Sequence, residues 1–173
     1  MPKQFYLIAG KPILIHSLEA FLKVEEMDEI IVSSPKECVN KTKDVIKEYD
    51  LTDPRITVIE GGKRRSDTIL NSINYTLEND YPKDSIMVTH DAARIFVTPK
   101  LIKDSIRYAK QYGAASAVIP ATDVIFESKK DGILTDVPDR QYLLQSQTPQ
   151  SFNINHYICL LYTSDAADDL TRV

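Results

Sequence analysis

The sequence predicts an α/β protein with three layers, in which helices cover both faces of a mostly parallel sheet. Short apolar runs rich in β-branched residues alternate with helical patterns along the chain. The runs are continuously apolar, which is typical of strands buried on both faces. The length of 173 residues and the hydrophobic content of 43% suit one globular domain with a real core.

The elements follow one another in a regular order. The predicted strands are 28–34, 55–60, 85–90 and 115–120, and the predicted helical segments are 36–49, 66–77 and the stretch from Pro99 to about Tyr112. A helix between two buried strands is typical of a crossover unit, so the alternation favours a sheet covered on both faces.

The pattern changes after Pro120. Two strand-like runs within 123–137 flank Asp131-Gly132, which is a strong hairpin signal. A two-stranded arm has too few neighbours to be stable alone. We therefore expect an arm over about 123–141 that packs on another surface, such as a second subunit in a homodimer.

Composition excludes several classes of function. The net charge of −4 argues against a nucleic-acid-binding protein, so any anion site must be local. No run approaches a membrane span, and no leader pattern opens the chain. Cys38 and Cys159 are too few for a disulfide framework, and the expected compartment is the cytoplasm.

The segment after the second strand has the features of an anion site. In open sheets ligands bind beyond the carboxyl ends of strands, where "GGKRRSDTI" occupies 61–69 and opens a helix. Gly61 and Gly62 permit close backbone approach, three cations follow, and Ser66 and Asp67 are residue types that cap helices. Phosphate is the expected ligand. The alternative is a glycine turn followed by a solvated basic run.

A carboxylate follows the third strand. Asp91 could bind Mg²⁺, which takes one or two protein oxygens and keeps waters and substrate phosphates as its other ligands. The alternative is a turn cap. A basic, glycine-rich strand end beside an acidic one suits a magnesium nucleotide. We interpret His90 and His16 as structural.

Six ordered motifs carry a family resemblance. They are "PKQF" (2–5), "GKPILIHSLEAF" (10–21), "GGKRRSDTILNSI" (61–73), "VTHDAARIFVT" (88–98), "DR" (139–140) and "QTPQSF" (147–152). Together they resemble the cytidylyltransferases that activate polyol phosphates, over positions 2 to about 157. The resemblance implies a Rossmann-like nucleotidyltransferase fold and transfer of CMP from CTP to a polyol phosphate, with pyrophosphate released.

The resemblance also implies residue roles. Lys3 and Arg140 are implied as catalytic, Arg94 and Arg140 as substrate-binding, and Asp91 as the metal ligand. The implied CTP-binding residues are Gly61, Gly62, Lys63, Arg64, Arg65, Ser66, Asp67, Thr68 and Ala92.

The substrate branch follows from finer features. "VTHDA" and "QSQTPQSFNIN" look more like ribitol-5-phosphate cytidylyltransferase, and the alternative is 2-C-methyl-D-erythritol 4-phosphate cytidylyltransferase. A degenerate nucleotide-binding or dimerisation module is the non-enzymatic alternative. A dinucleotide oxidoreductase is disfavoured, because the sequence contains no G-x-G-x-x-G.

The sequence departs from the family at both ends. The family's first strand and glycine-rich loop are missing before the PKQ motif, and 159–173 resembles translated sequencing-adapter DNA. We therefore expect an incomplete domain over 1–158, a non-native tail and an inactive fragment. Ile95 stands where the family has proline, and Val124 stands where many relatives have threonine.

Overall fold

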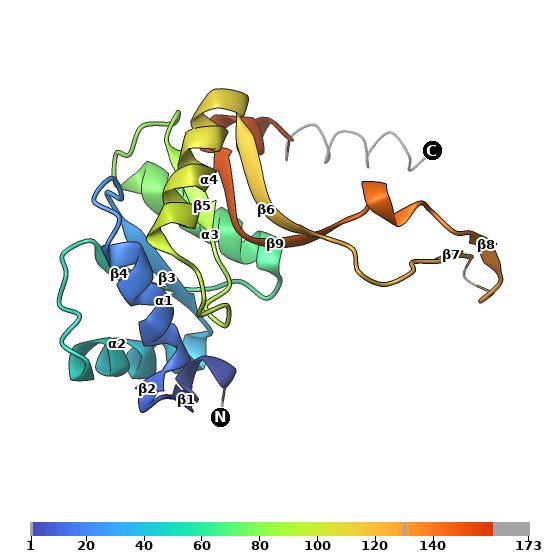
Figure 1. The fold of residues 1–173 in the computed structure, drawn as a ribbon. Coiled ribbons are helices and arrows are strands. Elements are labelled where there is room, and N and C mark those ends of the chain that lie inside the picture. The colour runs from blue at the N-terminus through green and yellow to red at the C-terminus, as the bar shows by residue number, and fades with distance from the viewer. Residues whose placement is uncertain (1, 130, 161–173) are drawn as a thin grey trace.

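A computed structural model describes residues 2–129 and 131–160. The helices are α1 (Ile13–Leu22), α2 (Val39–Glu48), α3 (Arg65–Glu78) and α4 (Pro99–Tyr112), with short 3₁₀ helices η1 (Lys3–Phe5), η2 (Lys36–Cys38) and η3 (Arg140–Tyr142). The strands are β1 (Leu7–Ile8), β2 (Lys11–Pro12), β3 (Ile30–Ser34), β4 (Ile56–Glu60), β5 (Ile86–Thr89), β6 (Ala114–Pro120), β7 (Glu127–Ser128), β8 (Leu134–Asp136) and β9 (Leu144–Asn153). Figure 1 shows their arrangement.

The strands form separate sheets. β3 and β4 pair in parallel, with Ile30 opposite Ile56. β9 lies between β5 and β6 and runs antiparallel to both. The α/β class is confirmed, and the sheet arrangement is mixed because the last strand enters between two earlier strands in the opposite direction.

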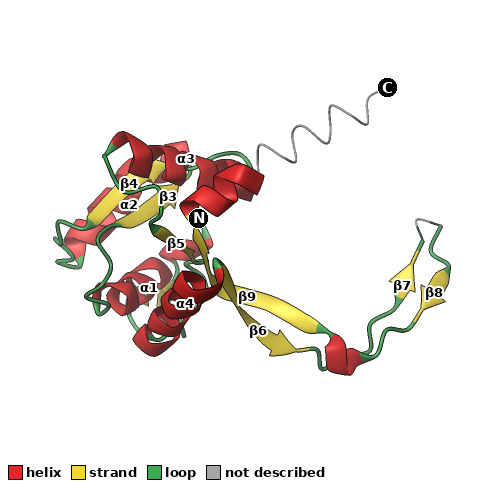
Figure 2. Ribbon diagram, turned by 90° about the horizontal axis from the view of Figure 1, so that it is seen from above, coloured by secondary structure: helices red, strands yellow, loops and turns green. Residues whose placement is uncertain are grey.

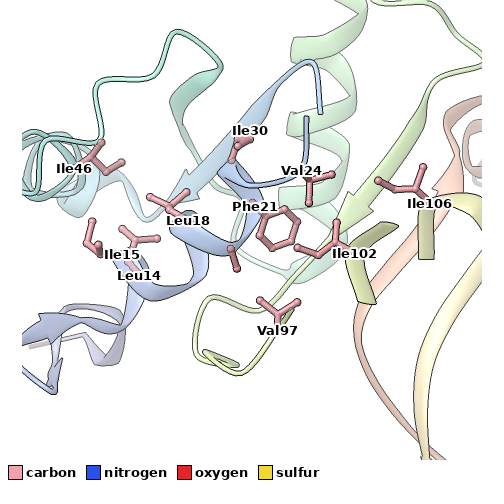
Figure 3. Packing of buried hydrophobic residues seen from close by; sticks show 11 residues of the cluster. Leu14, Ile15, Leu18, Phe21, Val24, Ile30, Ile46, Val97, Ile102 and Ile106 are labelled. Carbon is pink, nitrogen blue, oxygen red and sulfur yellow. The ribbon is translucent and has the colours of Figure 1, made fainter. Parts of the chain in front are cut away.

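Helices cover both faces of the strands (Figure 2). The buried cluster joins α1, α2 and α4 to one face through Leu18, Phe21, Ile46, Ile102 and Ile106, as Figure 3 shows. On the opposite face, Ser72 of α3 hydrogen-bonds Ser33 of β3 at 3.1 Å between their hydroxyl oxygens. The predicted three layers are therefore present.

Local signals explain the bounds of α4. Thr98 caps its start, since its hydroxyl accepts a 3.2 Å hydrogen bond from the Leu101 amide, and Pro99 occupies the first turn. The helix stops at Gly113, whose φ of +87° suits the left-handed C-terminal position. The predicted segment from Pro99 to about Tyr112 is therefore confirmed.

The predicted arm projects from the body (Figures 1 and 2). β6 and β9 continue outward, and β7 and β8 pair near its tip, with Glu127 opposite Asp136. Gly132 supports the turn with a φ of +82°. Large apolar side chains lie exposed along the arm, including Phe126 and Leu134.

Two further predictions concern membrane-spanning helices and the C-terminal tail. No helix within 2–129 and 131–160 is long and apolar enough to cross a membrane. Residues 161–173 of the predicted non-native tail lie outside the described residues.

Candidate active site

The glycine turn after β4 is held tightly against the start of α3. The Gly61 amide donates to the Ser34 carbonyl at 2.8 Å, and the Gly62 amide donates to the Thr68 hydroxyl at 3.0 Å. A Cβ on Gly62 would lie 2.7 Å from the Asp67 carbonyl carbon, whereas one on Gly61 would meet nothing closer than 3.4 Å. Gly62 is therefore required by close backbone approach, and Gly61 is not.

The start of α3 differs from the sequence prediction. Arg64, rather than Ser66 or Asp67, is the N-cap residue, and Asp67 stands at the third helical position. The Arg64 amide donates to the Asp67 carboxylate at 3.1 Å, and its guanidinium contacts the same group. Side-chain hydrogen bonding from Arg64 is the main cause that lowers the pKa of Asp67. Asp67 caps α3 from within its first turn, because its carboxylate accepts a hydrogen bond from the Arg64 amide, which has no partner inside the helix.

The three successive cations have different surroundings. Lys63 and Ser66 are exposed, and the Arg64 guanidinium is paired with Asp67 on its own helix. Arg65 instead crosses to the end of β5, where it forms an ion pair with Asp91 Oδ1 and donates to Gln150 Oε1 at 3.3 Å. The three cations therefore differ in role: they are neither all free in solvent nor all directed at one anion site.

Asp91 joins two guanidinium groups. Arg65 contacts its Oδ1, and Arg94 Nε donates to its Oδ2 at 3.3 Å. Burial acts to raise the pKa of Asp91, but the hydrogen bonds and charges of Arg65 and Arg94 outweigh it and hold this pKa below its ordinary value. The carboxylate is therefore charged at neutral pH, and the pair of arginines leaves a local excess of positive charge at this edge.

His90 holds the backbone that carries Asp91. The Thr148 hydroxyl lies 3.0 Å from His90 Nδ1 and accepts a 3.3 Å hydrogen bond from the Asp91 amide. His90 Nε2 lies 3.2 Å from the Arg94 carbonyl, and its ring packs on Phe21 with centroids 5.3 Å apart. Burial is the main cause that lowers the pKa of His90. A neutral imidazole that donates from Nε2 and accepts at Nδ1 satisfies both contacts, and this agrees with the structural role predicted for His90.

Several of the predicted site residues line one cavity. Lys3, Arg65, Thr68, Asp91 and Ala92 line the same cavity. The Ala92 carbonyl is also held in place, because it accepts a 2.8 Å hydrogen bond from the Ser17 hydroxyl of α1.

The arm carries the remaining predicted residue. Arg140 begins η3, the orange turn out on the arm in Figure 1, where its guanidinium donates to the Thr122 carbonyl at 3.3 Å. The structure thus separates Arg140 from the residues around Asp91 within one chain. Val124 is also exposed on the arm, whereas Ile95 is half-buried beside Arg94.

Sequence reasoning missed the contribution of β9 to this site. Gln147 contacts the Arg94 guanidinium, Gln150 contacts Arg65, and Thr148 holds His90. Their motif, "QTPQSF", carried the family resemblance, and two amide side chains near the end of the chain were the available signal. The missing information was the position of β9, which a pattern of local elements does not define.

A metal at this site would have one protein carboxylate, Asp91, as its ligand. Within 2–129 and 131–160, no group of three or more His, Cys, Asp or Glu side chains could hold an ion. A single carboxylate suits Mg²⁺, which takes most of its ligands from water and substrate phosphates. Both Asp91 oxygens contact arginines, so binding at Asp91 requires these guanidiniums to turn toward another anion.

The chain is similar to a known protein family and to several solved structures. The model of a family described as "IspD: 2-C-methyl-D-erythritol 4-phosphate cytidylyltransferase" matches residues 1–169. Among solved structures, a 4-diphosphocytidyl-2C-methyl-D-erythritol synthase from Anaerococcus prevotii DSM 20548 is similar at 24% identity and a TM-score of 0.77, over 93% of this chain and 67% of that chain. A second structure of a synthase with that name is 27% identical at a TM-score of 0.73, over 89% and 72% of the two chains. The 2-C-methyl-D-erythritol 4-phosphate cytidylyltransferase of Francisella tularensis is 24% identical at a TM-score of 0.78, over 100% and 76%.

Proposed function

Because the chain belongs to the 2-C-methyl-D-erythritol 4-phosphate cytidylyltransferase family, we propose that it transfers CMP from CTP to 2-C-methyl-D-erythritol 4-phosphate. Pyrophosphate and a CDP-linked polyol are the products. The observation that carries the proposal is the cluster of Arg65, Asp91 and Arg94 beside the glycine turn. This substrate is the alternative of the sequence analysis, and the family match supports it over ribitol 5-phosphate.

The proposed reaction is a displacement at the α-phosphorus of CTP. A phosphate oxygen of the acceptor forms a bond to this phosphorus, the bond to the bridging oxygen of the β-phosphate breaks, and pyrophosphate leaves with that electron pair. Such chemistry needs alignment and charge neutralisation more than covalent help from the protein. Arg65 and Arg94 provide guanidinium groups that can fork phosphate oxygens, while Lys3 adds positive charge at the same cavity.

We propose roles for the remaining residues from their contacts in the structure. Gly61, Gly62 and Thr68 shape the turn that receives the nucleotide, and Asp67 fixes the helix start. Ala92 presents backbone beside Asp91. Lys63, Arg64 and Ser66 lie exposed at the same turn and are placed at its outer rim.

Magnesium is part of the proposal, with Asp91 as its protein ligand. When bound, the ion neutralises charge on the triphosphate. In the structure Arg65 and Arg94 hold both oxygens of Asp91. We propose that the phosphates of CTP draw the two guanidiniums away and thereby free the carboxylate for the ion.

We further propose a homodimer formed through the arm. The arm exposes several large apolar side chains, among them Ile125, Phe126 and Leu134. An arm of this kind is marginal in water unless a second surface covers it. Docking of the arm on a second copy would bring Arg140 to the partner's nucleotide site, where it would hold the phosphate of the acceptor.

Ribitol 5-phosphate is the second candidate acceptor. The "VTHDA" and "QSQTPQSFNIN" stretches favour it. The two candidates differ in the methyl branch and in the number of hydroxyl groups. Pyrophosphate release from CTP and Mg²⁺ with each acceptor, together with calorimetric binding of each acceptor, distinguishes them. We expect methylerythritol phosphate to be preferred, and the reverse preference would assign the ribitol branch.

The nucleotide role of Arg65 is tested by Arg65→Lys. Lysine keeps the charge but loses the planar fork, so we expect calorimetry to show CTP binding at least tenfold weaker with an unchanged melting temperature. Arg107→Lys is the matched control, because Arg107 is an exposed arginine paired with Asp104 on α4. Equal CTP affinity in the Arg65→Lys variant would remove Arg65 from the site.

A further inference from the structure

Each arginine beside Asp91 also contacts a glutamine side chain of β9. Arg65 Nη2 donates to Gln150 Oε1 at 3.3 Å, and Arg94 Nη1 donates to Gln147 Oε1. Both glutamines are half-buried. Each guanidinium therefore has one charged acceptor, which is the shared Asp91 carboxylate, and one neutral acceptor on β9.

Hydrogen bonds within the sheet fix the position of Gln150. Its Nε2 donates to the Ser146 hydroxyl at 2.9 Å, which directs the amide oxygen of the same group toward Arg65. Its backbone carbonyl accepts a 3.2 Å hydrogen bond from the Thr89 hydroxyl of β5. Both ends of this side chain are therefore held before any ligand arrives.

Gln147 is fixed through the next residue of β9. The buried Thr148 hydroxyl accepts a 3.3 Å hydrogen bond from the Asp91 amide and lies 3.0 Å from His90 Nδ1. These contacts join β9 to the segment that carries Arg94. The amide oxygen of Gln147 is therefore positioned relative to the same segment as the guanidinium that it holds.

The neutrality of the two amides matters for binding an anion. Arg65, Arg94 and Asp91 carry two positive charges and one negative charge, so this cluster has one positive charge in excess. An amide oxygen accepts a hydrogen bond from a guanidinium without reducing that excess, whereas a carboxylate at either glutamine position would cancel it. A guanidinium has more N–H groups than two acceptors use, and the others can fork an incoming phosphate.

We propose that Gln147 and Gln150 are positioning residues for the phosphate-binding arginines of this site. They hold the two guanidiniums in place when Asp91 releases them, and they preserve the positive charge that attracts phosphate. The inference rests on the proposed function, because it explains how that nucleotide site is held ready. It also explains why an uncharged acceptor, and not a carboxylate, stands at both positions of β9.

The test compares two substitutions at each position in the full chain. Methionine keeps the length of the glutamine side chain and removes the acceptor, whereas glutamate keeps an acceptor and adds a charge. Calorimetric titration with inorganic pyrophosphate measures anion affinity. NMR of the arginine Nε–H groups measures rotation about the Nε–Cζ bonds of Arg65 and Arg94, and therefore reports how firmly each guanidinium is held.

The two substitutions should have opposite effects on rotation and the same direction of effect on affinity. In Gln147→Met we expect rotation at Arg94 to be faster and pyrophosphate to bind about threefold more weakly, because one hydrogen bond is lost. In Gln147→Glu we expect slower rotation at Arg94 and binding about tenfold weaker, because the new carboxylate pairs with the guanidinium and repels the anion. The Gln150 variants should act in the same way on Arg65.

This pattern separates positioning from a general structural role. A structural role would lower the melting temperature and would not combine a more firmly held arginine with weaker anion binding. Gln145→Met and Gln145→Glu are the matched controls, because Gln145 is an exposed residue of the same strand. We expect both to keep the pyrophosphate affinity and the arginine rotation of the unaltered chain at physiological ionic strength, where exposed charges are screened.

Two results would overturn the inference while the proposed function stands. One is unchanged pyrophosphate affinity in the Gln147 and Gln150 variants, and the other is an equal loss of affinity in the Gln145 variants. An unaltered chain that binds pyrophosphate in this pattern but does not bind CTP would contradict the proposed function and support the positioning role. An unaltered chain that does not bind pyrophosphate would overturn both.

Discussion

Neighbouring residues of one kind have different roles at the glycine turn. Gly62 is packed against the backbone of Asp67, while Gly61 has room for a methyl group. Arg64 is committed to its own helix, while Arg65 crosses to Asp91. Residue type at a motif position is therefore a weaker guide to role than the atoms that surround it.

The two glycines give a matched pair of substitutions. We expect Gly62→Ala to lower the free energy of unfolding by about 1–3 kcal/mol, because the new methyl group overlaps backbone that cannot move without shifting α3. Gly61→Ala should change it by less than about 1 kcal/mol. Urea denaturation measures both, and equal losses would contradict the assigned packing.

His90 gives a pH-dependent prediction. Its pKa in the folded chain is lowered by burial, so on acidification the unfolded chain takes up the proton first. Stability from this residue is therefore present above about pH 6.5 and is lost as pH falls toward the folded pKa, with a slope of at most about 1.4 kcal/mol per pH unit. Urea denaturation between pH 7.5 and 5 should show a smaller slope for His90→Asn.

At the scale of elements, one arginine joins the start of β4 to the end of α1. Arg55 donates to the carbonyls of Leu22, Val24 and Met27 at 3.1 to 3.4 Å, and it pairs with Asp53. Helix ends leave carbonyls without partners inside the helix. Arg55, at the start of β4, therefore supplies donors to carbonyls at and just after the C-terminal end of α1.

We expect Arg55→Leu to lower the free energy of unfolding by about 1–3 kcal/mol, because several carbonyls lose their donor at once. The free energy of unfolding of Arg55→Lys should lie between those of the unaltered chain and Arg55→Leu, since one ammonium group cannot reach all of the same acceptors. Chemical denaturation provides the measurement. Arg107→Leu is the control, because it removes an exposed arginine and should lower the free energy of unfolding by no more than about 0.5 kcal/mol. A similar loss in Arg55→Leu and Arg107→Leu would contradict the stabilising role of the Arg55 hydrogen bonds.

Prediction from sequence succeeded for local elements, for the layers and for the arm, and it missed the last strand of the sheet. The helix predicted at 66–77 is Arg65–Glu78, and the strand predicted at 115–120 is Ala114–Pro120, because apolar patterns and caps are local signals. β9 was not predicted, since "LQSQTPQSFN" is polar and contains a proline. Its insertion between β5 and β6 depends on distant pairing, and so the contacts of Gln147 and Gln150 were missed.

At the scale of the whole molecule, the arm extends the surface far from the core. Its apolar side chains lie outside the cluster formed by α1, α2 and α4. Their burial requires a second surface, which is the basis for the proposed homodimer.

The homodimer is tested by substitution at the tip of the arm. We expect the unaltered chain to sediment as a dimer and Phe126→Ser with Leu134→Ser to sediment as a monomer, because each buried side chain of this size contributes about 1.5–3 kcal/mol. Phe96→Ser is the control, since Phe96 is 91% exposed and lies outside the arm. A monodisperse monomer for the unaltered chain would contradict the proposal.

The position of β9 between β5 and β6 also sets the order in which the chain can fold. Both outer strands pair with β9 and not with each other, and β9 follows β5 by more than fifty residues. During synthesis β5 and β6 therefore emerge without a partner and must wait for residues 144–153. Pairing over such sequence separation is slow and leaves strand edges exposed in the meantime. We therefore expect slow refolding, because the strand that is synthesised last of the three lies in the middle of its sheet.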